Sequence, residues 1–151
     1  MHSRTHLLIA MFFGFMYFKL FPGMAIWEKY IFSTFLIGAS LLPDIDTPTS
    51  TLGRKHTVIS YLATHRGSFH SIWLPLVSVF FALIYPVLSS SLLAIAIGYG
   101  AHLVADAFTK HGIKPFAPLS KYKISGPLKT GSFVETLIAA AVVMFFLVQP
   151  F

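Results

Sequence analysis

Five apolar stretches leave this sequence few ways to fold. Hydrophobic residues make up 56% of the 151 residues and charged residues only 11%, against about 25% charged in soluble domains. Each stretch is close to the minimum of about 17 residues that an α-helix needs to cross a bilayer. The sequence therefore predicts an all-α integral membrane bundle of about five transmembrane helices, forming a single domain over residues 1–151. The stretches are approximately Thr5–Phe21, Met24–Leu42, Ile72–Leu88, Leu92–Phe108 and Phe133–Val148.

The connections between these stretches differ greatly in length. Pro22-Gly23 and the serines at 89–91 predict tight turns, whereas 44–71 and 109–132 are long loops. With five spans, both long loops lie on the same side of the membrane as the N-terminus. Because positively charged segments stay in the cytoplasm, we expect the N-terminus and a cap of two loops inside, and the C-terminus outside. The basic residues on the predicted inner side are Arg4, Arg54, Lys55, Arg66, Lys110, Lys114, Lys121, Lys123 and Lys129.

Histidine and acidic residues gather at the helix ends on this same side. They come from the start of the first helix, the end of the second, the segment before the third and the last turns of the fourth. Chance would scatter such residues over both membrane faces, so their position at one level indicates a functional site. The candidate residues are His6, Asp44, Asp46, His65, His70, His102 and Asp106.

The spacing of these residues suits a metal site. His102 and Asp106 are four positions apart on a helix, so they share one face. Buried carboxylates are costly unless they are compensated, and a cation would compensate them. With no cysteine in the chain, imidazole and carboxylate ligands favour zinc, or manganese, over copper. The number of candidate ligands exceeds the usual four of one zinc ion, which favours two or more ions.

Simpler interpretations exist for each residue taken alone. Asp44 and Asp46 could be turn residues after a proline, and His102 could be a packed core histidine. Glu135 could be a cap of the fifth helix, a ligand or a base. Only the coincidence of so many such residues at one level favours the metal interpretation. We assign no role to the remaining histidines, His2, His56 and His111.

Three ordered motifs carry a resemblance to a known family. They are Leu-Leu-Pro-Asp-Ile-Asp at 41–46, His-Arg-Gly-Ser-Phe-His-Ser at 65–71 and Gly-Ala-His-Leu-Val-Ala-Asp at 100–106. Together with the opening Arg-Thr-His at 4–6, they resemble the YdjM-like family, whose members are described as inner-membrane, predicted metal-dependent hydrolases. That family looks distantly similar to the zinc phospholipases C and the nuclease P1 group. The chain departs from the family pattern at Thr47 and Phe69, where histidine and threonine are common, and Thr47 is therefore not expected to be a ligand.

The resemblance implies a metal-dependent hydrolase at the cytoplasmic face of the inner membrane, acting on a phosphoester of a lipid or polyprenyl carrier. The seven candidate residues would be metal ligands, with Asp46 either a ligand or the general base. Arg66 would hold phosphate in a forked hydrogen bond. The expected partners are the bilayer and a lipid-like phosphorylated substrate, and no nucleic acid. Two rivals remain open, namely a metal-ion or proton transporter and a membrane scaffold with a structural metal.

Overall fold

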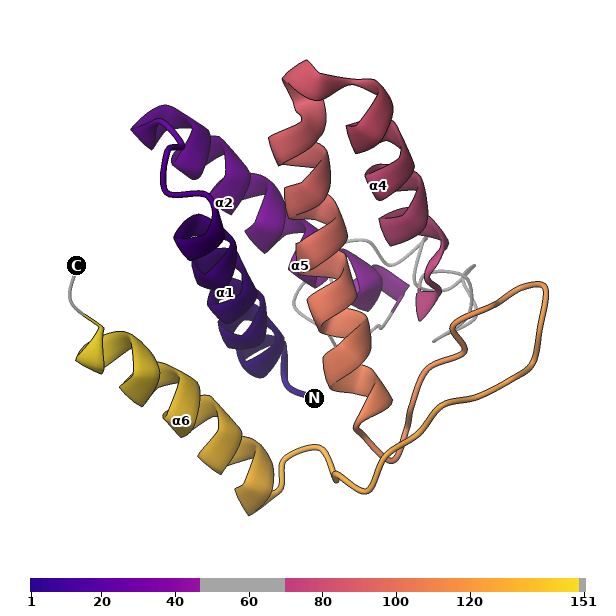
Figure 1. Cartoon of the computed structure of the whole chain (residues 1–151). Helices are drawn as coiled ribbons and strands as arrows, with labels where there is room; N and C mark the ends of the chain where they lie inside the picture. The colour runs from indigo at the N-terminus through magenta and orange to yellow at the C-terminus, as the bar shows by residue number, and fades with distance from the viewer. Residues whose placement is uncertain (47–69, 150–151) are drawn as a thin grey trace.

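The apolar stretches fold as α-helices, arranged as Figure 1 shows. The computed structural model describes residues 1–46 and 70–149, and only the backbone of Ile45 and Asp46. Within these ranges there are five α-helices and no β-strand, so the prediction of an all-α fold is confirmed for the described residues. The α-helices are α1 (Ser3–Leu20), α2 (Ile26–Leu41), α4 (Trp73–Ile84), α5 (Ser89–Ala107) and α6 (Phe133–Val148), and the short 3-10 helices are η1 (Leu42–Asp46) and η3 (Pro86–Leu88).

The turn between α4 and α5 lies earlier than the sequence predicts. Tyr85 ends α4 with non-helical backbone angles (φ −115°, ψ 84°), as expected for a residue that precedes a proline. η3 then leads directly into α5, and the serines at 89–91 form the first turn of that helix. The expectation that these serines turn the chain is therefore wrong, because Pro86 breaks the third stretch first.

Helix α5 lies at the centre of the bundle, where it packs against α1, α2 and α4, while α6 packs against α1. Small residues on α5, such as Ala94 and Ala101, are buried against Phe32 and Leu36 of α2. At Gly98 the backbones of α5 and α2 lie close together, because an added Cβ would be 2.3 Å from the carbonyl oxygen of Leu36. Small residues at such positions are typical of closely packed membrane helices.

Large apolar side chains point away from the bundle on several helices. Leu83, Phe133 and Leu147 are 79%, 76% and 74% exposed. An apolar outer surface of this kind is suited to lipid rather than to water.

Helix length supports fewer membrane spans than the sequence predicts. Among the described residues, one helical segment is long and apolar enough to cross a bilayer, namely the 22 residues of Pro86–Ala107. α4 and α6 are apolar but contain 12 and 16 residues. At about 1.5 Å per residue these helices are shorter than a hydrocarbon core of about 30 Å. By length and composition alone, one helical segment of the described residues qualifies as a membrane span, rather than five.

The segment between α5 and α6 is irregular, and hydrogen bonds stabilise it both internally and against the start of α4. The backbone of Thr109 accepts hydrogen bonds from Gly112 and Gly126, both 3.0 Å long. Further along, the carbonyl oxygen of Pro115 accepts a 2.9 Å hydrogen bond from the backbone of Ile72, just before α4. Trp73 donates a 3.0 Å bond from its indole nitrogen to the carbonyl of Ala117. This segment therefore covers the end of the bundle at which α4 begins and α5 finishes.

Candidate metal centre

The last turns of α5 contribute the two most central side chains of the site. His102 is fully buried and Asp106 is 1% exposed. Their spacing of four residues places both on the same helix face, as the sequence predicts, and His102 Nε2 lies 3.8 Å from Asp106 Oδ2. Two ionisable groups enclosed at the end of an apolar helix require partners from other elements.

The first of these partners comes from α1. His6, near the start of that helix, is 1% exposed. Its Nε2 atom lies 3.3 Å from Asp106 Oδ1. Its ring stacks on that of His102, with centroids 3.8 Å apart and an interplanar angle of 11°. The α-ammonium group of Met1 also reaches Asp106 Oδ1, at 2.8 Å, so this carboxylate has one cationic partner within the chain.

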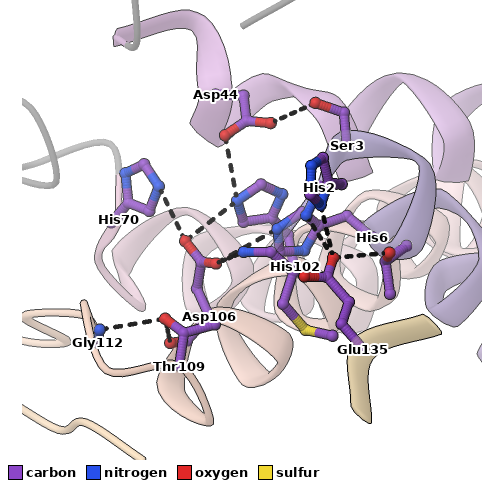
Figure 2. Close-up of polar contacts among 12 residues, drawn as sticks. His2, Ser3, His6, Asp44, His70, His102, Asp106, Thr109, Gly112 and Glu135 are labelled. Carbon is purple, nitrogen blue, oxygen red and sulfur yellow. Dashed lines mark hydrogen bonds and ion pairs between the residues drawn. The ribbon is translucent and has the colours of Figure 1, made fainter. Parts of the chain in front are cut away.

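Two further partners come from the segments flanking α2 and α4, and Figure 2 shows them around Asp106 and His102. Asp44, in η1, places Oδ1 3.8 Å from His102 Nε2, and its Oδ2 accepts a 3.1 Å hydrogen bond from the Ser3 hydroxyl. His70, just before α4, places Nε2 3.6 Å from Asp106 Oδ2. Four separate parts of the chain thus meet at one end of the bundle.

These side chains form two overlapping groups that could each hold a metal ion. One group is His6, His102 and Asp106, and the other is Asp44, His70 and His102. Within each group the ligand atoms lie within 4.8 Å of one another. Both groups contain imidazole and carboxylate without sulfur, which is a donor set that zinc and manganese accept.

The hydrogen bonding of His102 fits a metal-binding role. Its Nδ1 atom lies 2.8 Å from the carbonyl oxygen of Ser40, an oxygen that can only accept, so Nδ1 carries the proton. Nε2 is then left with its lone pair directed toward the two carboxylates. Metal-binding histidines are commonly held in this way, because the second hydrogen bond fixes both the tautomer and the ring orientation.

The burial of the nitrogen atoms supports the same conclusion. Among the described residues, His102 Nε2 and both ring nitrogens of His6 are buried without a well-directed hydrogen bond, although His6 Nε2 lies 3.3 Å from Asp106 Oδ1. A buried polar atom left unsatisfied costs about 1–3 kcal/mol. A divalent cation at this position would bind these nitrogens and neutralise the enclosed carboxylates, so the residues present fit a metal ion.

The structure brings together five of the seven predicted ligands: His6, Asp44, His70, His102 and Asp106. His65, Arg66 and the side chain of Asp46 lie outside the described part of the chain. The residues that the sequence analysis missed are Ser3 and Ser40, which hold Asp44 and His102 in place. The residue type of Ser40 gives no signal, because its backbone carbonyl oxygen makes the contact with His102, whereas its hydroxyl donates to the carbonyl of Ile37.

The sequence matches the model of the YdjM inner membrane protein family over residues 1–150. The chain belongs to this family. Membership confirms the resemblance carried by the three motifs and places the protein with a family described as inner membrane proteins. A relative among curated proteins is YvsG of Bacillus subtilis (strain 168), described as uncharacterized, which is 34% identical over 126 residues, or 76% of this chain and 78% of the relative. No solved structure matches the chain.

Proposed function

We propose that this YdjM-family protein is a membrane-bound, metal-dependent hydrolase that acts on a phosphoester of lipid or polyprenyl type at the cytoplasmic face. The observation that carries the proposal is a cluster of three buried imidazoles with the buried carboxylate of Asp106 and the partly exposed carboxylate of Asp44. Nε2 of His102 is buried there without a hydrogen bond. An arrangement of this kind is costly for a fold unless it binds a cation. Buried ionisable groups in membrane helices also mark functional sites more often than structural ones.

Five side chains would hold the metal, and zinc is the ion that suits them best, with manganese as the alternative. Asp106 directs one carboxylate oxygen toward His6 and the other toward His70 and His102. It is therefore the carboxylate that lies nearest all three imidazoles, and it would be a central ligand of a bound ion. A divalent ion held there would supply Lewis-acid activation of a water molecule and of a phosphoryl oxygen.

The chain itself would contribute orientation, proton transfer and phosphate binding. Ser3 and Ser40 hold Asp44 and His102 in position. Asp46 follows Asp44 by two residues, so it is the candidate for a general base or a further ligand. Arg66, in the 65–71 motif that also contains His70, would bind a phosphate oxygen pair.

The proposed topology places this site at the level of lipid headgroups. We propose that all five α-helices cross or enter the bilayer, with the N-terminus inside and the C-terminus outside, because the basic residues lie almost entirely on one side. Every ligand then lies at a cytoplasmic helix end. A transporter site is expected nearer the middle of the membrane, on broken helices, and this difference favours the hydrolase over the transporter.

The test is hydrolysis of phosphorylated lipids by purified protein in detergent and in lipid nanodiscs. Release of phosphate or of a phosphorylated headgroup should occur with the metal-loaded protein, stop on chelation and return on addition of Zn²⁺ or Mn²⁺. His102→Ala should be inactive, while His111→Ala, which changes an exposed histidine, should retain activity. If the metal-loaded protein hydrolyses nothing in a broad panel but carries metal ions into liposomes, the transporter replaces the hydrolase.

A further inference from the structure

Glu135 is a buried carboxylate at the start of α6 that lies outside both candidate metal groups. It is 3% exposed. Its oxygens accept hydrogen bonds from the backbone of His2 at 2.6 Å, the hydroxyl of Thr5 at 2.8 Å and the backbone of Gly131 at 2.8 Å. The ring nitrogen Nδ1 of His2 lies 3.3 Å away. With its oxygens occupied by these donors, Glu135 is poorly suited to be a metal ligand or a base.

Two of these donors, His2 and Thr5, belong to the start of α1, so the carboxylate stabilises the N-terminus of that helix. That helix has no side-chain hydrogen bond at its N-cap, His2, and no acidic residue in its first turn. The backbone N–H groups of a first helical turn lack partners within the helix, and negative charge there is stabilising. Glu135 provides that charge from a position 133 residues after His2, and Figure 2 shows its carboxylate directed at this turn.

The same turn of α1 carries two residues of the metal centre. His6 directly follows Thr5, and its Nε2 atom lies 3.3 Å from Asp106. Ser3 lies one residue after His2 and donates its hydroxyl to Asp44. Rotation or fraying of this turn would therefore move the ligand His6 and break the hydrogen bond from Ser3 that holds the ligand Asp44.

We infer that Glu135 is a positioning residue that presents His6 to the metal centre and couples α6 to metal binding. The inference rests on the proposed function, because it requires that the cluster binds a metal ion. Partners of metal ligands commonly affect metal affinity by about 10–100-fold when they are removed. A residue that served only the packing of α6 on α1 would change stability without changing the site.

Co²⁺ titration followed by visible absorption separates these two roles. Glu135 contacts Thr5 and His2 rather than His6 itself, so Glu135→Ala should weaken Co²⁺ binding by at most the range of about 10–100-fold found for direct partners of ligands. At saturating Co²⁺ its spectrum should resemble that of His6→Ala. Glu135→Gln keeps one acceptor oxygen and should therefore lose less Co²⁺ affinity than Glu135→Ala. Thr5→Val should also weaken binding, while Thr5→Ser, which keeps the hydroxyl, should restore it.

Glu28 is a matched control, since both glutamates are the third residue of their helix. Within the described part of the chain, Glu28 accepts a hydrogen bond only from its own helix end, through the backbone of Ala25 at 2.8 Å. Glu28→Gln should therefore leave the affinity and the spectrum unchanged. Wild-type affinity and spectrum in folded Glu135→Ala and Thr5→Val would overturn the inference and leave the proposed function standing. Absence of Co²⁺ binding by the unaltered protein would overturn both.

Discussion

Replacing Gly98 by alanine would place a methyl group 2.3 Å from the carbonyl oxygen of Leu36. Ordinary contacts of this kind are at least 3.4 Å, so α5 and α2 must separate locally by about 1 Å. One helical turn further along both helices, His102 lies 2.8 Å from the carbonyl oxygen of Ser40. A similar separation there would stretch this hydrogen bond beyond the distance at which it contributes.

The expected loss of stability combines the overpacking at Gly98 and the weakened hydrogen bond of His102. Overpacking costs about 1–3 kcal/mol, and loss of the hydrogen bond adds about 0.5–1.5 kcal/mol. We therefore expect Gly98→Ala to have a free energy of unfolding about 1.5–4.5 kcal/mol lower than that of Gly100→Ala, which shares its gain in helix propensity. Because the ring of His102 would no longer be fixed, metal affinity should fall by about 10–100-fold.

Gly100→Ala is the control, because a Cβ at Gly100 meets no described atom within 4 Å. Both substitutions give the same gain in helix propensity, so the difference between them isolates the contact with Leu36. Denaturant unfolding in detergent measures stability, and competition with a chromophoric chelator measures metal affinity. Equal stability and equal affinity of the two variants would refute the argument that this contact sets the position of His102.

Three further predictions follow from the same site. A periplasm-only reporter fused to the C-terminus should be active and a cytoplasm-only reporter inactive, and the reverse result would contradict the five-span topology. Asp46→Asn should lower turnover more than metal content if Asp46 is the base, and lower both together if it is a ligand, while full activity would exclude either role. Ser3→Ala should weaken metal binding by up to about tenfold, because Asp44 loses the hydroxyl that holds it, and an unchanged affinity in chelator competition would show that Asp44 is held by other contacts.

The helices could be predicted from the sequence because each apolar stretch has few alternatives to a helix in lipid. Their ends were less predictable where two signals competed. Pro86 and the serines at 89–91 both favour a turn, and the proline ends the helix first because it restricts the residue before it. Helix length alone supports fewer spans than the five predicted, since α4 and α6 contain 12 and 16 residues.

The candidate site was predictable in composition but not in contacts. The common level of His6, His102 and Asp106 follows from the positions of the helix ends. The stacking of His6 on His102 depends on how α1 crosses α5, which no local pattern specifies. The role of Glu135 at α1 could not be predicted either, because a first-turn glutamate normally caps its own helix. Only the packing of α6 on α1 shows that Glu135 also accepts hydrogen bonds from the start of α1.

Elemental analysis of the purified protein tests the central claim most directly. We expect at least one zinc or manganese ion per chain in the unaltered protein. His102→Ala and Asp106→Ala should each lower the bound metal, because these residues contribute to the candidate groups, whereas His56→Ala and His111→Ala should not. If the unaltered protein and all four variants contain the same amount of metal, or none, the assignment of this cluster as a metal centre is wrong.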